Sequence, residues 1–296
     1  MIDRLEQLLA LAREKHFGRA AEACGVSQPT LSASVKYLEE TFGTSLVERG
    51  SRFVGFTPAG ERVLGWARRI VADSRAMRQD VVGFRRALSG TLRIAAIPTA
   101  LPRLIRLTAP YARANPDVRL SIVSRSSADI GRMLADLEVE AGVTYLDGEP
   151  LRRVDAVPLY RERFRYVCTG ADPLAQRPSL AWRELGDTRL CLLTPDMQNR
   201  RIVDRALAAA EVAPVVAMES DSMLTLLVHV RTGAWASILP EQWVSELPAA
   251  ANLRAIPLTT PEVGNLVGLV VPRREPANAL TAALLTAATS IAGDMA

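Results

Sequence analysis

The 296-residue sequence holds few of the residues on which enzyme chemistry and metal binding usually depend. Its three cysteines, Cys24, Cys168 and Cys191, are far apart and have no metal-ligand spacing. Its two histidines, His16 and His229, have no partner cysteine, serine motif or carboxylate pair, and there is no Walker loop or dinucleotide-binding fingerprint. We therefore expect no catalytic residue, no metal site and no cofactor. We expect the cysteines to be buried thiols in a reducing compartment.

Long apolar runs are also missing. No stretch approaches the roughly 18 apolar residues of a membrane span, and the polar N-terminal residues Met1 to Glu6 contain no signal-peptide core. These absences predict a cytoplasmic protein without a membrane partner. The formal net charge is only +4, with 14 Lys and Arg against 10 Asp and Glu over residues 1–90 and 22 against 22 in the remainder. An excess confined to one end is typical of a chain that meets a polyanion there.

The N-terminal region has the pattern of a helix-turn-helix. Apolar residues at helical spacing predict a helix over residues 2–13 and a short second helix over residues 18–24. Ser27 and Pro29 predict the start of a third helix, because Ser is a favoured cap and Pro is tolerated in a first turn. The motif also needs a small residue at the helix crossing, a residue of positive φ in the turn and an apolar anchor, and the sequence supplies Ala21, Gly25 and Leu31.

Two further elements follow this motif. Short apolar pieces around a Gly-Ser turn predict a small hairpin over residues 45–56. Thr57 followed by Pro58 predicts a helix start, and helical periodicity then continues to about Leu88. A helix of this length between domains normally packs against a partner, so we expect it to pair with a second copy.

From residue 90 onward, strand-like and helical runs alternate. Strands are predicted at 91–97, 119–124 and 140–146, a strand-rich section from 154, helices at 199–210 and 222–232, and a last strand at 267–271 before a final helix. Such alternation favours a parallel α/β sheet with helices on both faces. The last strand and helix are expected to return to the first lobe of this region.

The stretch FGRAAEACGVSQPTLS (residues 17–32), together with Leu46, Arg49 and Thr57-Pro58-Ala59-Gly60, resembles the DNA-binding region of LysR-type transcriptional regulators. The resemblance implies an α/β protein with an N-terminal winged helix-turn-helix, a long linker helix and a two-lobed effector domain similar to periplasmic binding proteins. The implied domains are a DNA-binding domain at 1–58, a dimerisation helix at 59–89 and an effector-binding domain at 90–296. Lobe I is placed at about 90–160 and 268–296, and lobe II at about 161–267.

The third helix is expected to enter the major groove of promoter DNA with its N-terminal residues meeting base edges. Gln28 suits adenine, Pro29 and Thr30 suit thymine methyl groups, and Ser34 suits a base or phosphate. The residues expected to contact phosphates are Ser27, Ser32, Lys36, Arg49 and Arg52. A solvated helix face is the alternative for the polar residues of this helix.

The effector is expected at the carboxyl ends of strands, beside helix N-termini. After the first strand, Thr99 can cap a helix and present free amides to an anion, and Ala100 beside it is a further candidate. Ser126 and Ser127 follow the second strand, and the resemblance implies that Thr99 and Ser127 hold carboxylate effectors. Helix capping without a ligand is the alternative for both. The other candidates are Tyr145, Thr194, Gln198 and Asn199.

The expected partners are double-stranded promoter DNA, a small anionic effector and further copies of the chain. The resemblance implies a homodimer through the linker helix and a homotetramer of dimers, with RNA polymerase as a further candidate partner. The stretches at 97–102 and 193–200 resemble regulators of formate dehydrogenase operons. The alternatives are an enzyme, a transport solute-binding protein and a non-specific architectural DNA protein. A redox-sensing pair of Cys168 and Cys191 also stays open, because some LysR-type proteins sense peroxide in this way.

Overall fold

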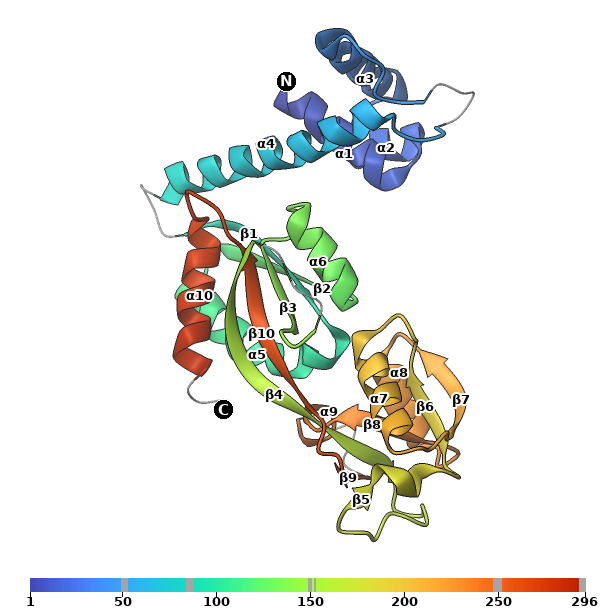
Figure 1. The fold of residues 1–296 in the computed structure, drawn as a ribbon. Helices are drawn as coiled ribbons and strands as arrows, with labels where there is room; N and C mark the ends of the chain where they lie inside the picture. Colours follow the sequence, from blue (N-terminus) through green and yellow to red (C-terminus); the bar gives the residue numbers. More distant parts are fainter. Residues whose placement is uncertain (49–52, 84–87, 149–150, 152, 247–251, 293–296) are drawn as a thin grey trace. The chain divides into compact units, whose positions relative to one another are not determined.

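The computed structural model describes residues 1–48, 53–83, 88–148, 151, 153–246 and 252–292. The chain forms two compact units: Met1–Ser89 with Ala135–Glu138, and Gly90–Leu134 with Val139–Ala296. Figure 1 traces both along the sequence. Among the helices of the described part, none combines the length and apolarity that crossing a bilayer would need.

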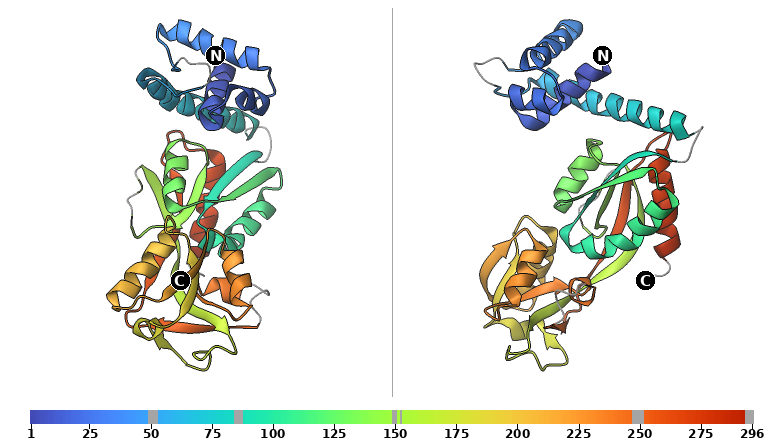
Figure 2. Two further views of the ribbon diagram at one scale, coloured as in Figure 1. Left: turned by 90° about the vertical axis from the view of Figure 1, so that its right-hand side faces the viewer. Right: turned by 180° about the vertical axis from the view of Figure 1, so that it is seen from behind.

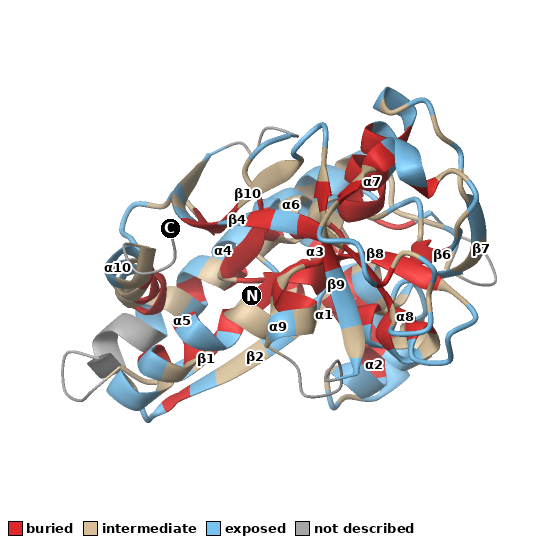
Figure 3. Ribbon diagram, turned by 90° about the horizontal axis from the view of Figure 1, so that it is seen from below, coloured by how far each residue is buried: buried red, intermediate tan, exposed pale blue. Residues whose placement is uncertain are grey.

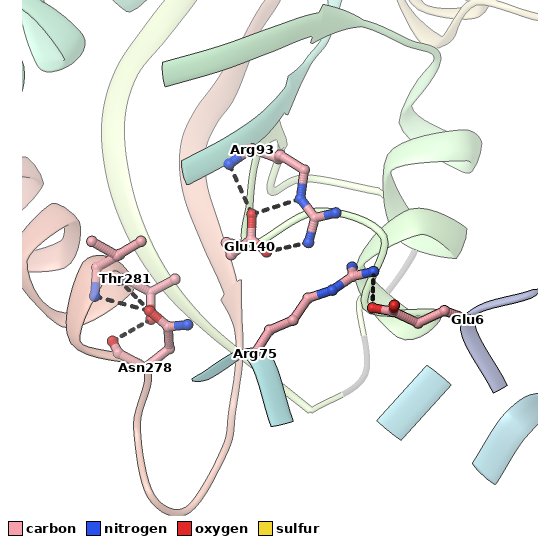
Figure 4. Close-up of polar contacts among 7 residues, drawn as sticks. Glu6, Arg75, Arg93, Glu140, Asn278 and Thr281 are labelled. Atoms are coloured by element: carbon pink, nitrogen blue, oxygen red, sulfur yellow. Dashed lines mark hydrogen bonds and ion pairs between the residues drawn. The ribbon is translucent and has the colours of Figure 1, made fainter. Parts of the chain in front are cut away.

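The first unit contains the predicted helices. They are α1 (Ile2–Glu14), α2 (Phe17–Ala23), α3 (Gln28–Phe42) and α4 (Pro58–Gly83). Their apolar stripes form one core, which includes Leu8, Leu11, Leu31, Leu38 and Leu64. Arg75 of α4 donates to Glu6 of α1 at 2.9 Å and fastens the linker helix to the first helix (Figure 4).

The turn between α2 and α3 has the predicted chemistry. Gly25 has φ +66°, a conformation that costs glycine little because it has no Cβ. The Ser27 hydroxyl accepts a hydrogen bond from the Thr30 amide at 3.3 Å and caps α3. The predicted helix-turn-helix is therefore confirmed.

The segment after α3 pairs with the chain before α4. An isolated antiparallel bridge joins Val47 to Phe56, and the Glu48 amide donates to the Gly55 carbonyl at 3.0 Å. The predicted hairpin is confirmed at its base, and its tip lies outside the described residues. Thr57 caps α4 as predicted, since its hydroxyl accepts from the Gly60 amide at 3.0 Å.

The second unit begins with lobe I. Its elements are β1 (Gly90–Ala96), the 3-10 turn η1 (Pro98–Ala100), α5 (Leu101–Ala114), β2 (Val118–Ser124), α6 (Ser127–Ala135) and β3 (Ala141–Tyr145). β1 pairs in parallel with β2 on one side and with β3 on the other. Right-handed crossovers in opposite directions place α5 and α6 on opposite faces of the sheet, and α10 (Ala279–Ala292) packs beside α5 (Figures 1 and 2).

Two long antiparallel strands connect the lobes. β4 (Val154–Thr169) pairs with β10 (Gly264–Pro272) up to Arg163 and with β8 (Ala236–Pro240) from Phe164 onward. β10 also pairs antiparallel with β3, so the C-terminal strand returns to lobe I as predicted. The predicted parallel pairing is seen within each lobe, and the sheet as a whole is mixed, because these crossing strands run antiparallel to their neighbours.

Lobe II repeats the α/β plan. Its elements are β5 (Leu180–Ala181), η2 (Trp182–Leu185), β6 (Arg189–Leu193), α7 (Gln198–Ala209), β7 (Val215–Ser220), α8 (Met223–Val230), β8, α9 (Gln242–Ser245) and β9 (Leu253–Thr259). β6 is flanked in parallel by β7 and β8. The predicted domain and lobe boundaries stay predictions.

Buried residues gather in the strands and on the inner sides of the helices (Figure 3). Several polar side chains of lobe I that are not fully buried make local hydrogen bonds. Arg93 of β1 binds Glu140 through both its backbone amide, at 2.8 Å, and its guanidinium, and Asn278 caps α10 through the Leu280 amide at 2.9 Å (Figure 4 shows both residues). These contacts fix the lobe I frame that carries the site described next.

Candidate DNA-binding surface and effector site

The N-terminal half of α3 presents a polar, exposed side. Among the predicted DNA-binding residues, Ser27, Gln28, Pro29, Thr30, Ser32 and Lys36 are exposed. Ser34 is only 8% exposed and lies among the core residues of the helix. Arg49 and Arg52 lie outside the described residues. The surface available to a groove is therefore the first six of these residues, without Ser34.

Local contacts already orient part of this surface. The hydroxyls of Ser27 and Thr30 are 2.8 Å apart, and Lys36 lies 3.7 Å from Glu40 one turn later. The Arg4 guanidinium lies over the exposed ring of Tyr37, 3.7 Å from its centre. This pair is not apparent in the sequence, because a cation stacked across two helices has no periodic signal. The pair holds a positive charge beside α3, where it would attract the phosphates of bound DNA.

In the second unit, the ends of β1, β2, β3 and β6 surround a small cavity of about 10 Å³, room for about one water molecule. Its walls come from both lobes. Six of the predicted effector residues line it: Thr99, Ser126, Ser127, Tyr145, Gln198 and Asn199. Ala100 and Thr194 are predicted residues that lie next to lining residues in the sequence and do not line the cavity themselves.

Thr99 does not cap a helix, which corrects one sequence expectation. α5 starts after Ala100 with no side-chain cap, and the Thr99 hydroxyl lies instead 3.3 Å from the Tyr145 hydroxyl. The Asn199 amide of lobe II donates to the same Tyr145 oxygen at 3.4 Å. Tyr145 therefore connects the two lobes at the wall of the cavity.

At the second predicted junction, between β2 and α6, the neighbouring residues Ser126 and Ser127 have different roles. Ser126 caps α6, since its hydroxyl accepts from the Asp129 amide at 3.2 Å and donates to the Asp129 carboxylate at 2.9 Å. Within the described part of the chain, the Ser127 hydroxyl oxygen is buried without a hydrogen-bond partner, and so is that of Thr194 in lobe II. A buried hydroxyl without a partner costs free energy, so these oxygens mark positions where a water or ligand would be stabilised.

Behind Tyr145 lies a carboxyl group that the sequence analysis missed. Glu162 of β4 is 0% exposed and accepts a hydrogen bond from Tyr145. Its other oxygen accepts from the Gln242 amide at 2.9 Å. Gln242 and the Trp243 indole both donate to the Thr99 carbonyl, at 3.3 and 3.0 Å. α9 of lobe II is thereby bound to the turn after β1.

Burial changes the titration of this cluster. Desolvation raises the pKa of Glu162 from 4.5 to about 7, against the opposing effect of hydrogen bonds from Tyr145, Thr99, Gln242 and Asn199. Desolvation, and secondarily the Glu162 charge, raises the pKa of Tyr145 well above its usual value. Glu162 occupies an inward position of the alternation along β4, between Tyr160 and Phe164. An acid in that register was the sequence signal that could have revealed it.

The cavity wall carries no lysine or arginine among the described residues. Arg200, at the start of α7, is committed elsewhere: its guanidinium donates to the Leu193 carbonyl at 2.7 Å and pairs with Glu219 and Asp204. A bound anion would therefore be held by hydroxyls and amides rather than by a cation.

A helix-turn-helix joined to a two-lobed domain with a polar interlobe cavity is the architecture of a ligand-responsive DNA-binding protein, and comparisons with known proteins agree. Residues 2–61 match the model of the bacterial regulatory helix-turn-helix protein, lysR family. Residues 85–291 match that of the LysR substrate binding domain. The chain belongs to the LysR family of transcription regulators.

Several relatives are similar over nearly the whole chain. The hydrogen peroxide-inducible genes activator of Haemophilus influenzae is 27% identical over 90% of this chain and 88% of its own length. The DNA-binding transcriptional dual regulator OxyR of Escherichia coli is 28% identical over 90% and 87%. A full-length OxyR variant from Pseudomonas aeruginosa superposes with a TM-score of 0.74 at 28% identity, covering 98% of this chain and 94% of that one. These relatives are named as regulators of transcription and not as enzymes.

Proposed function

We propose that this regulator reads promoter DNA with the exposed side of α3 and that a small anion held between the two lobes controls it. The observation that supports the effector part of this proposal is the cavity between the lobes. Two buried hydroxyls at or beside it, those of Ser127 and Thr194, have no hydrogen-bond partner among the described residues and are available to a ligand. The cavity holds about one water, so a larger ligand enters only when the lobes move apart. Ligand occupancy would thereby set the angle between lobes.

Pairing of chains is part of the same proposal. Apolar side chains on α4 are exposed, with Trp66 at 63%, Ile70 at 42% and Met77 at 60%. A single chain gains nothing from exposing them, whereas a second copy of α4 would bury them. Their exposure supports a homodimer through α4, and a tetramer and contacts with RNA polymerase are further proposals.

For DNA recognition, we expect Gln28→Ala to lose discrimination between base sequences, because a paired amide contact contributes about 1–3 kcal/mol against the wrong base. Lys36→Ala should weaken binding to all sequences similarly and lower the salt dependence by about one counterion. The measurement is fluorescence anisotropy, over a range of salt, with DNA selected by the protein from a random-sequence pool.

Thr41→Ala is the control for these variants, since Thr41 is exposed near the other end of α3 and donates to the Tyr37 carbonyl. It should bind as the wild type does. Unchanged affinity and discrimination in the Gln28 variant would contradict the assignment of α3 as the reading helix.

For the effector, we expect small carboxylates to raise the melting temperature of the wild type and not that of Thr99→Ala. The Thr99 hydroxyl is one of the donors available to an anion at the end of β1, and its removal leaves the backbone unchanged. Sodium formate is the first probe, given the resemblance to regulators of formate dehydrogenase operons, and acetate is the second. Differential scanning fluorimetry measures the shift.

Thr108→Ala is the matched control, because Thr108 is also buried but donates to the Leu104 carbonyl inside α5 at 3.1 Å. It should respond to carboxylates like the wild type. An equal shift in the Thr99 variant would place the ligand elsewhere.

The sequence leaves Cys168 and Cys191 open as a redox-sensing pair, and some relatives are named activators of hydrogen peroxide-inducible genes, but the cysteines here do not support such a role. Cys168 and Cys191 are 1% and 0% exposed in lobe II, and the cavity wall contains no cysteine among the described residues. Burial raises the pKa of Cys168 to about 12 and that of Cys191 to about 11. Because the thiolate is the reactive form, a protonated buried thiol is a poor peroxide sensor. We therefore keep the anion proposal for this chain.

A further inference from the structure

A continuous chain of hydrogen bonds runs from the core of the second unit to the cavity wall. It begins at the Glu162 carboxyl on β4, passes through the Tyr145 hydroxyl at the end of β3, and ends at the Thr99 hydroxyl in η1. Thr99 and Tyr145 both line the cavity, whereas Glu162 lies behind them. The chain thus connects a titratable group without solvent contact to the surface that would meet a ligand.

Glu162 has no ion-pair partner among the described residues, and its polar contacts are neutral groups. β3 contributes Tyr145, η1 contributes Thr99, and α7 and α9 contribute the Asn199 and Gln242 amides. Two charged side chains, Arg103 and Glu246, act on Tyr160, two positions earlier on β4, and their effects on the Tyr160 pKa oppose one another. No neighbouring cation therefore holds Glu162 in its ionised form.

The two protonation states of Glu162 require opposite directions of the hydrogen-bond chain. When Glu162 is ionised, Tyr145 donates to it, and the Tyr145 oxygen accepts from Asn199 and from Thr99. The Thr99 hydrogen then points away from the cavity. When Glu162 is protonated, its hydroxyl donates a hydrogen bond to the Tyr145 oxygen, and Tyr145 in turn donates a hydrogen bond to Thr99. Gln242 keeps the second carboxyl oxygen as an acceptor in both states.

The consequence concerns Thr99. In the protonated state its oxygen accepts from Tyr145, so its own hydrogen is free to donate into the cavity. In the ionised state the Thr99 oxygen presents lone pairs to the cavity, and the negative charge of Glu162 lies behind it. An anion is stabilised by the first arrangement and repelled by the second.

We propose that the anionic effector binds together with one proton, which stays on Glu162 and turns the Tyr145 and Thr99 hydroxyls so that Thr99 donates a hydrogen bond to the ligand. This inference rests on the proposed function, and it makes Glu162 and Tyr145 positioning residues that decide the charge the site accepts. The raised pKa of Glu162, about 7, supports the geometry, because protonation near neutral pH then requires little free energy.

The test is isothermal titration calorimetry of the full chain with sodium formate and sodium acetate at constant ionic strength, from about pH 6 to about pH 8.5. Two buffers of different ionisation enthalpy report the protons taken up. Above about pH 7, the dissociation constant of the wild type should increase about tenfold for each pH unit, with uptake approaching one proton per anion. This proton count needs no variant.

Glu162→Gln provides the variant arm. Its amide can donate to Tyr145 as the protonated acid does, so it should bind the anions with an affinity independent of pH and without proton uptake. Tyr145→Phe breaks the connection and should bind weakly with a reduced pH dependence. Glu262→Gln removes an exposed carboxylate that pairs with Arg163 at 3.6 Å, and it should behave as the wild type does.

Two contrary results have different meanings. If the anions bind to the wild type with constant affinity and no proton uptake, or if Glu162→Gln keeps the full pH dependence, this inference is wrong and the proposed function stands. If neither anion binds at any pH, the anionic effector itself is refuted and this inference with it.

Discussion

Replacing Gly60 by alanine is expected to unfold the first unit, while the second unit stays folded, and to abolish DNA binding. A Cβ at this position would lie 2.1 Å from the Leu46 carbonyl oxygen and 3.2 Å from the Phe56 Cβ. That carbonyl accepts the Thr57 amide at 3.0 Å, so the added methyl group must break the contact that closes the hairpin onto α4. Overpacking costs about 1–3 kcal/mol and occasionally more, and an approach of 2.1 Å to a backbone oxygen places Gly60→Ala at the upper end.

Hydrogen exchange should show the loss: amides of α1 to α4 become unprotected in the variant while those of lobes I and II keep their protection. Gly65→Ala is the matched control on the same helix, because a Cβ there would meet none of the described atoms within 4 Å apart from its chain neighbours and the adjacent backbone of its own helix. That variant should gain about 1 kcal/mol from helix propensity and bind DNA normally. Wild-type protection and DNA affinity in the Gly60 variant would mean that the Leu46 carbonyl does not approach α4 so closely.

The second large effect is on the pH dependence of stability without any ligand. Glu162 has a folded-state pKa of about 7 against a reference value of 4.5, so the folded chain binds the extra proton between these values. Its stabilising contribution is complete below about pH 4.5 and is lost as the pH rises through about 7. The shift corresponds to about 3 kcal/mol in favour of the acidic side.

Denaturant unfolding between about pH 5 and about pH 8 measures this change in the free energy of unfolding of the second unit. Glu162→Gln should remove most of the decrease and exceed the wild type in stability at the alkaline end. Glu262→Gln, which removes an exposed carboxylate, should retain the wild-type slope. Equal slopes in the wild type and Glu162→Gln would show that Glu162 ionises normally.

Local chemistry made the first unit predictable. Ser27, Gly25 and Thr57 act on residues within a few positions of themselves, and the structure has each in its predicted role. Capping and positive φ depend on neighbours in sequence, so a sequence pattern contains the needed information. Ser34 differs, because whether a short polar side chain near a helix start is exposed depends on which side of the helix meets the core.

The candidate effector site was predicted only in part. Strand ends indicated Thr99 and Ser127, but not that Thr99 would bind Tyr145 instead of capping a helix, or that Ser126 would be the cap of α6. Glu162 and Gln242 were missed entirely. They are 80 residues apart and meet only because β4 crosses from one lobe to the other and α9 packs back against η1.

By itself, the sequence determined the helix-turn-helix, the linker helix and the α/β character of the remainder, because apolar periodicity and capping are local properties that survive in a linear pattern. Only the tertiary structure decided which polar groups are buried from solvent and which of them form hydrogen bonds with one another. Desolvation depends on everything packed around a group, and that is why the acid behind Tyr145 became apparent only in the fold.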